Sequence, residues 1–160
     1  TGYQLTWLAC VFGENKYNQP TLGIYVGVIF LFIFFYFCKN KSKFIKISLY
    51  ISLPGYCFDT LMVYFLIYEF NSSLILGTLP SWMIILWLSF STLFEEILTI
   101  FKKYKLIGVL LSGILAPLTY YLGEPIGIIS IDNIFIFFSI MVVFWIFLMT
   151  YYLQFVLRKI

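Results

Sequence analysis

Long runs of apolar residues alternate with short polar intervals along the whole chain of 160 residues. A helix needs roughly 20 residues to cross about 30 Å of hydrocarbon, and the chain can be divided into six segments of this kind. The predicted spans cover residues 1–13, 21–38, 44–68, 74–101, 106–123 and 133–157. The first is short, and we expect it to be completed upstream or to insert only partway. The runs are continuously apolar, without a period of two, so they predict helices instead of a membrane barrel.

Positive charge falls in every second interval between these runs. The basic residues in these intervals are Lys39, Lys41, Lys43, Lys46, Lys102, Lys103, Lys105, Arg158 and Lys159. The alternate intervals contain a single basic residue, Lys16, beside Glu14, Glu69, Glu124 and Asp132. Because basic loops stay in the cytoplasm, this distribution predicts a fixed orientation with both termini cytoplasmic.

Composition supports a membrane class and excludes several others. Hydrophobic residues make up 62% of the chain and charged residues only 11%, against about 25% charged in soluble domains. The net charge is +3, but the basic residues are not interleaved with aromatic residues, so no nucleic-acid partner is expected. The three cysteines have no C-x-x-C spacing and histidine is absent from the sequence, so no metal or cofactor is expected. The predicted fold class is all-α: one polytopic transmembrane helical bundle over residues 1–160.

Asp59 is the most costly residue to bury. It lies 13 residues beyond Lys46, which places it about 20 Å into the bilayer if the segment is helical. An ionised carboxylate at that depth costs a few kcal/mol, so the side chain is expected to face the bundle interior. Ser48, Ser52 and Gly55 share its helix face and complete an inward polar stripe.

A second polar stripe leads to the adjacent acids Glu95 and Glu96. Ser91 and Glu95 are four residues apart and therefore share a face, whereas Glu96 points about 100° away. Glu95 is thus the expected interior member. The alternative for all these acids is structural, because buried carboxyl groups also join helices by hydrogen bonds.

Small residues form a seam along residues 106–123, which favours close helix packing. Depth along the helices places Ser112 level with Glu95, and Thr119 and Tyr120 level with Asp59. We therefore expect these hydroxyl groups to bond the two acids. Gly23 and Gly27 form a G-x-x-x-G pair, which is common in membrane helices and weak evidence of dimerisation.

Two spaced patterns resemble those of a known family. They are Q-x-x-W-x-A-C-x-x-G over residues 4–13 and G-x-x-x-P-x-x-Y-x-x-G over residues 113–123, with the Asp59 segment between them. The chain thereby resembles small bacterial inner-membrane proteins classified as a domain of unknown function, often encoded near enzymes that modify fatty acids. The resemblance implies that Gln4 and Trp7 line a lipid-accessible pocket. Glu95 and Glu96 depart from a histidine-containing patch of that family.

Three functions remain open at this level. The first is an accessory protein of the bacterial inner membrane that binds lipids or positions a partner membrane protein or lipid-modifying enzyme. Its candidate ligand-binding residues are Gln4, Trp7, Ser52, Ser112, Thr119 and Tyr120. The second is an intramembrane enzyme that acts on an acyl or isoprenoid lipid through carboxylic acids, for which Asp59, Glu95 and Glu96 are the candidate catalytic residues. The Phe94-Glu95-Glu96 run is similar to small proteins of the lycopene-cyclase type. The third is a proton-coupled carrier that titrates Asp59.

Overall fold

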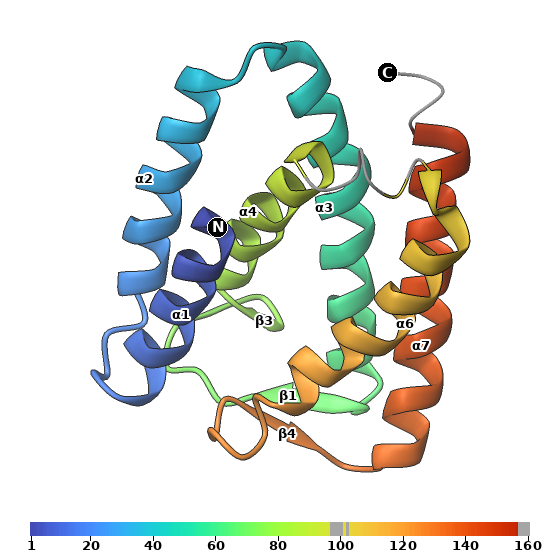
Figure 1. Cartoon of the computed structure of the whole chain (residues 1–160). Coiled ribbons are helices and arrows are strands. Elements are labelled where there is room, and N and C mark those ends of the chain that lie inside the picture. Colours follow the sequence, from blue (N-terminus) through green and yellow to red (C-terminus); the bar gives the residue numbers. More distant parts are fainter. Residues whose placement is uncertain (97–100, 102, 157–160) are drawn as a thin grey trace.

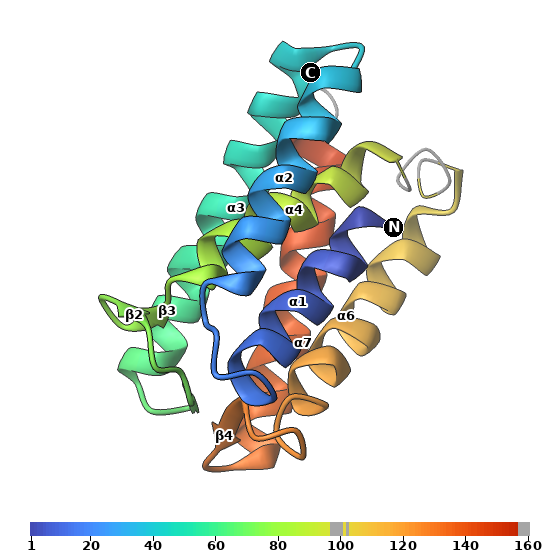
Figure 2. The ribbon, with the colours of Figure 1, turned by 90° about the vertical axis from the view of Figure 1, so that its left-hand side faces the viewer.

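The computed structural model describes residues 1–96, 101 and 103–156, with the side chains of Glu95 and Glu96 excepted. Six α-helices form most of this part of the chain (Figures 1 and 2). They are α1 (Gly2–Asn15), α2 (Leu22–Phe37), α3 (Lys41–Tyr64), α4 (Trp82–Glu96), α6 (Lys105–Tyr121) and α7 (Ile134–Tyr151). A π-helical turn, η1 (Tyr152–Val156), extends α7. Each helix falls largely within one predicted span, so the helical character of the chain is confirmed.

Four short strands correct the all-α prediction. β1 (Tyr68–Phe70) pairs antiparallel with β4 (Ile129–Ile131), and β2 (Ile75–Leu76) pairs antiparallel with β3 (Leu79–Pro80). The helix predicted for 74–101 therefore begins at Trp82, and the prediction is wrong for residues 74–81. Gly77 explains the difference, because its φ of +72° turns the chain between β2 and β3. The strands lie together at one end of the bundle (Figure 1).

Of the six predicted spans, only one is matched by a described helix that is both long enough and apolar enough to cross a membrane. Within the described residues, Ile134–Val156 is long and apolar enough to cross a membrane. Leu22–Phe37, Trp82–Phe94 and Lys105–Tyr121 are apolar but shorter. α3 has 24 residues, but it contains three lysines and Asp59. Six membrane crossings and the orientation of the termini thus remain predictions.

Helix α4 lies at the centre of the packing and contacts α1, α2 and α3. Helices α6 and α7 form a second packed pair, visible on the right of Figure 1. Ile47 and Ile51 of α3 and Phe137 and Met141 of α7 are fully buried in the common core. The β1–β4 pairing joins the segment after α3 to the segment before α7, and so links the two groups of helices.

The G-x-x-x-G pair serves packing inside the chain. A Cβ atom on Gly23 would lie 2.6 Å from the Cα of Cys10 in α1. A Cβ on Gly27 would collide with Ile85 of α4 and lie 2.9 Å from Cγ2 of Thr6. These two glycines therefore let α2 approach α1 and α4 closely.

Candidate functional site

A buried carboxylate, Asp59, lies at the junction of four elements. Its side chain is 0% exposed and accepts hydrogen bonds from three donors. Tyr68 Oη of β1 donates to Oδ1 at 2.5 Å, and Trp87 Nε1 of α4 donates to Oδ2 at 2.7 Å. Tyr120 Oη of α6 is shared between both oxygens at 3.1 and 3.0 Å. Asp59, Tyr68, Trp87 and Tyr120 are called the Asp59 network below.

The residues of α3 that precede Asp59 pack this helix closely against α4. Gly55 lies one turn before Asp59, and the ring of Trp87 packs on its backbone, where a Cβ would collide with the indole. Ser52 Oγ donates to the Trp87 carbonyl at 2.9 Å. Ser48 Oγ lies 2.8 Å from Ser91 Oγ, so the polar side of α3 faces α4 along its length. The predicted inward stripe is confirmed.

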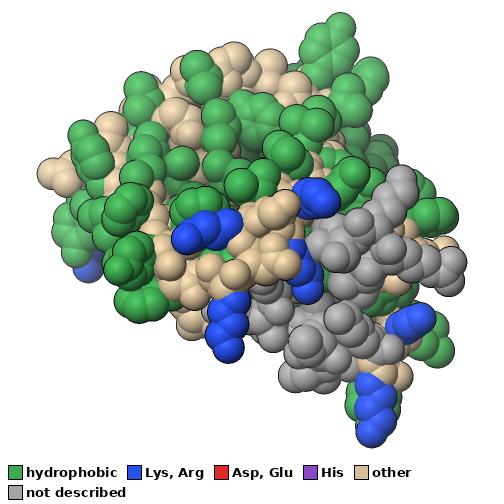
Figure 3. All heavy atoms as spheres, turned by 90° about the horizontal axis from the view of Figure 1, so that it is seen from above, with side chains coloured by type: hydrophobic (Ala, Val, Ile, Leu, Met, Phe, Trp, Pro, Cys, Tyr) green, Lys and Arg blue, Asp and Glu red, His purple; other side chains and the backbone are tan. Residues whose placement is uncertain are grey.

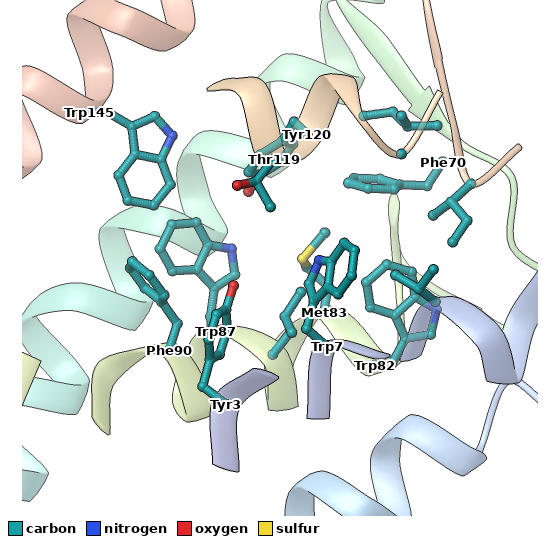
Figure 4. A pocket seen from close by; sticks show the side chains of 15 residues that line it. Tyr3, Trp7, Phe70, Trp82, Met83, Trp87, Phe90, Thr119, Tyr120 and Trp145 are labelled. Atoms are coloured by element: carbon teal, nitrogen blue, oxygen red, sulfur yellow. The ribbon is translucent and has the colours of Figure 1, made fainter. Parts of the chain in front are cut away.

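An aromatic pocket of about 70 Å³ adjoins the Asp59 network. Helices α1, α4, α6 and α7 contribute walls, and the segments around β1 and β4 contribute the remainder (Figure 4). Eight aromatic side chains dominate these walls: Tyr3, Trp7, Phe70, Trp82, Trp87, Phe90, Tyr120 and Trp145. Thr119 and Tyr120 line the α6 side. The set is called the aromatic pocket below.

Ring contacts hold the pocket walls rigidly. Trp87 and Trp145 are stacked, with centroids 5.6 Å apart and planes inclined by 14°. Phe90 meets Trp87, Trp145 and Tyr3 edge-on or nearly so, at 5.6, 5.4 and 5.3 Å. Such offset and edge-to-face pairs are favoured by the ring quadrupoles. The pocket is thus a preformed apolar space with few polar groups, as ligand sites for apolar molecules usually are.

The structure brings some of the predicted site residues together. Trp7, Thr119 and Tyr120 line the aromatic pocket, and Asp59 lies directly behind Tyr120. Tyr120 is confirmed as a partner of Asp59, whereas the prediction for Thr119 is wrong. Its hydroxyl donates to Leu115 O at 2.9 Å, because a helical threonine can bond the carbonyl one turn earlier.

Three other candidates have contacts that stabilise the fold and do not line the pocket. Gln4 is exposed and accepts from the Thr1 amino group at 2.7 Å. Ser52 bonds Trp87, as described above. Ser112 Oγ shares its one proton between Val109 O at 2.8 Å and Trp145 O at 3.2 Å, and the second contact ties α6 to α7. The candidate acids Glu95 and Glu96 end α4, but their side chains lie outside the described residues.

Sequence reasoning missed two of the three donors to Asp59. Tyr68 was placed at the end of a span, yet it lies in β1 and is 1% exposed. Trp87 was not among the residues expected at this site. A buried indole N–H usually needs an acceptor, so the depth of Trp87 relative to Asp59 was a usable signal. The orientation that turns the Tyr68 hydroxyl and the Trp87 indole toward Asp59 arises only when the elements that carry them are packed together.

Glu14 forms a second polar centre, at the end of the bundle where the strands lie. It is 8% exposed and accepts from Ser72 Oγ at 2.7 Å, Ser73 N at 2.8 Å, Ser73 Oγ at 2.9 Å and Trp82 Nε1 at 3.1 Å. Burial by itself raises the pKa of Glu14, but these hydrogen bonds outweigh it and hold the pKa below its ordinary value. Since Trp82 also lines the aromatic pocket, Glu14 orients one of its walls.

The described residues offer no site for a metal ion. No group of three or more histidine, cysteine, aspartate or glutamate side chains gathers anywhere in that part of the chain. Cys10 is buried in the core and Cys57 is exposed, and both are free thiols. What this arrangement provides chemically is an apolar binding space beside an anchored, fully hydrogen-bonded carboxylate.

Comparison with known proteins gives a family but no close relative of known activity. Neither the curated proteins nor the solved structures contain a match to this chain. The family model described as "Protein of unknown function (DUF2878)" matches residues 1–151, almost the whole chain. The chain therefore belongs to the DUF2878 family, an uncharacterised domain of unknown function, in agreement with the resemblance carried by its spaced residues.

Proposed function

We propose that this chain is an integral protein of the bacterial inner membrane, with six helices in the bilayer and both termini in the cytoplasm. The outward surfaces of the helices support a membrane location, because large apolar side chains cover them. Phe32 of α2, Leu106 of α6 and Phe135 of α7 are 73%, 71% and 83% exposed. Water-soluble monomers rarely expose continuous apolar surface of this kind. In Ile134–Val156 only 28% of the apolar window is buried, unlike the core helix of a soluble protein.

The distribution of charge supports the orientation. Lys39, Lys41, Lys43 and Lys46 lie around the turn between α2 and α3, and Lys103 and Lys105 lie at the start of α6. The face of the molecule seen in Figure 3 carries lysine side chains, and none of the described side chains visible there is acidic. Glu14, Glu69, Glu124 and Asp132 belong to the segments at the opposite end, together with Lys16. Basic residues are retained on the cytoplasmic side.

For its activity we infer a non-catalytic, lipid-binding role, in which the aromatic pocket holds an apolar, lipid-derived ligand. The observation that carries this inference is the pocket itself, an apolar space walled by eight aromatic side chains. The Asp59 network joins α3, α4, α6 and β1 behind the pocket, so the walls are preorganised before any ligand arrives. A partner membrane protein, such as a lipid-modifying enzyme, would be served by a ligand presented in this way.

Native mass spectrometry of the gently extracted protein tests the lipid-binding role. Thr119→Phe should fill the pocket, because Thr119 lines it and its hydroxyl bonds only its own helix. Ser139→Phe is the matched control, since Ser139 is exposed, does not line the pocket and bonds Phe135 O in the same way. A lipid mass should remain on the wild-type protein and on Ser139→Phe and should be absent from Thr119→Phe. Equal retention by both variants, or no retained lipid on the wild type, would refute the proposal.

Reporter insertion tests the orientation. Gly77 lies at an exposed turn with nothing within 4 Å of an added Cβ, so an inserted domain disturbs no packing there. A reporter that is active only in the periplasm should be active after Gly77 and inactive when fused after Lys43. The reverse pattern would overturn the orientation, and activity at neither position would overturn the membrane topology.

A further inference from the structure

A second pocket, lined by polar side chains, lies at the end of the bundle that carries the strands. Its volume is about 340 Å³, and Glu14 is the only charged side chain among the described residues that line it. A cavity of this volume is in the range of small-molecule sites. Its other polar side chains come from the end of α1, the turn after it and the segment after β1: Asn15, Asn18, Asn71, Ser72 and Ser73. This set is called the polar pocket below.

The polar pocket and the aromatic pocket adjoin each other. Ile128 is 4% exposed and lines both of them. On α1, Val11 lines the aromatic pocket, and Glu14, three residues later, lines the polar pocket. The consecutive residues Phe70 and Asn71 are divided between the two pockets in the same way. The two pockets are therefore neighbours along three segments of the chain, as the two parts of a site for one amphipathic molecule would be.

The amide oxygens of the polar pocket are free to accept hydrogen bonds. Asn15 Nδ2 and Asn71 Nδ2 each donate to a backbone carbonyl of residues 126–127, in the turn before β4. These bonds use the amide nitrogens and leave both Oδ1 atoms without a donor among the described residues. The two serine hydroxyls of the pocket already donate to Glu14. The ligand group that fits these side chains is therefore one that donates several hydrogen bonds.

Charge selects the kind of donor. Glu14 is ionised at neutral pH, because its hydrogen bonds hold its pKa below the ordinary value of 4.5. The segments at this end of the molecule also carry Glu69, Glu124 and Asp132, and four carboxylates against the single Lys16 give a net charge of −3. No lysine or arginine is among the described residues that line the polar pocket. A cationic group is thus attracted to this pocket and an anionic group is repelled.

We propose that the polar pocket binds the primary ammonium headgroup of an amphipathic lipid whose apolar chain lies in the aromatic pocket. A primary ammonium carries the charge that Glu14 attracts, and its three N–H groups can donate to the amide oxygens of Asn15 and Asn71. The proposal rests on the lipid-binding function and the orientation proposed above, and it names the class of the lipid. In that orientation the polar pocket lies at the outer face of the membrane, where lipid headgroups lie.

Competition between three phospholipids with identical acyl chains, followed by native mass spectrometry, tests this proposal. The lipid-depleted protein in a neutral detergent is incubated with an equimolar mixture of phosphatidylethanolamine, phosphatidylcholine and phosphatidylglycerol. The phosphate is common to all three, so they differ only in the terminal group: a primary ammonium, an ammonium without N–H groups, and neutral hydroxyls. The ethanolamine lipid should be retained at about fivefold the level of either competitor, the effect of roughly one charge-assisted hydrogen bond.

Two substitutions with opposite expected effects test the place of the ammonium group. Glu14→Gln removes the charge and should bring the three lipids to equal retention. Asn18→Asp adds a charge to the polar pocket and should raise the preference for the ethanolamine lipid about threefold. Aspartate tolerates the positive φ of 50° at this position. Thr78→Asp is the matched control and should leave the preference unchanged, because Thr78 is exposed in the turn between β2 and β3 and does not line the polar pocket.

The outcomes separate this proposal from the function on which it rests. Equal retention of the three lipids by the wild type, or a preference for the glycerol lipid, would overturn the ammonium assignment and leave lipid binding intact. Equal retention of the ethanolamine and choline lipids would show that N–H donors have no role, and would also overturn it. Retention of no lipid would refute both proposals.

Two further results concern the place and the source of the ammonium group. A preference that is the same in the wild type and in Asn18→Asp would refute the assignment of the headgroup to the polar pocket. Glycerophosphoethanolamine has the headgroup without acyl chains, and the wild-type protein should not retain it at the concentration used for the lipids. Its retention would assign the pocket to a soluble amine and overturn the lipid source.

Discussion

Asp59 and Trp87 are 28 residues apart in the sequence, and the indole N–H of Trp87 donates to the Asp59 carboxylate at 2.7 Å. The same indole packs on Gly55 and stacks on Trp145. One hydrogen bond thereby sets the position of a ring that contacts α3 and α7 and forms a wall of the aromatic pocket. Asp59 therefore fixes the position of Trp87, and through it one wall of the aromatic pocket.

Asp59→Asn should be tolerated and Asp59→Leu should not. Trp87 can only donate, whereas the hydroxyls of Tyr68 and Tyr120 can donate or accept. The asparagine oxygen can face Trp87 while its amide group donates to the tyrosines, so the loss of unfolding free energy should be about 1 kcal/mol. Leucine leaves three buried donors unpaired and should cost about 3 kcal/mol or more. Denaturant titration in detergent measures both, and equal losses would contradict this role.

The Asp59→Asn variant also distinguishes a lipid-binding protein from a proton-coupled carrier. Asparagine cannot titrate, so a carrier that uses Asp59 should lose proton-coupled flux in Asp59→Asn although the protein remains stable. A lipid-binding protein should retain its bound lipid in that variant. Flux assays in vesicles and native mass spectrometry provide the two measurements.

Tyr68→Phe should destabilise the protein more than Tyr120→Phe. Tyr68 donates a single bond of 2.5 Å from a nearly fully buried position. Tyr120 divides its hydroxyl between two oxygens at 3.0 and 3.1 Å. Hydrogen bonds to charged groups contribute about 1.5–3 kcal/mol, and we expect the upper part of that range for Tyr68 and the lower part for Tyr120. The reverse order of unfolding free energies would refute the ranking.

Glu14 should make stability depend on acid pH. Its folded pKa lies below the ordinary value of 4.5, so the stabilisation is complete above pH 4.5 and is lost as pH falls through the folded pKa. Glu14→Gln should lower Tm at pH 7, and its difference from the wild type should shrink as the pH is lowered below 4.5. The control is Glu69→Gln, because Glu69 is exposed and its side chain makes no hydrogen bond to a described residue. A difference in Tm that does not change with pH would contradict this role.

Gly23→Ala should destabilise the monomer without a change of oligomeric state. The new Cβ would lie 2.6 Å from the Cα of Cys10, a backbone atom that cannot move without a shift of α1. Overpacking of this kind costs about 1–3 kcal/mol. Val28→Ala, at a position of the same helix that is 49% exposed, is the control. Light scattering of the detergent-extracted protein should give the same mass for all variants, and dissociation in Gly23→Ala would instead support a dimer contact.

The sequence by itself determined the helical segments, the inward direction of Asp59 and one of its partners. Each of these follows from local properties. The length of an apolar run limits a helix, and the 3.6-residue period places Ser48, Ser52 and Asp59 on one face. Counting residues from the basic intervals was enough to set Tyr120 at the depth of Asp59.

Only the tertiary structure decided the rest of the site. Tyr68 reaches Asp59 because β1 pairs with β4, which lies about sixty residues further along the chain, as shown by the register of Tyr68 with Ile131. Trp87 reaches it because α4 packs on α3 with one particular rotation. Tyr3 of α1 and Trp145 of α7 line one pocket only once the helices are packed together. Strand pairing and helix rotation depend on contacts between distant segments, and no local pattern of residues encodes them.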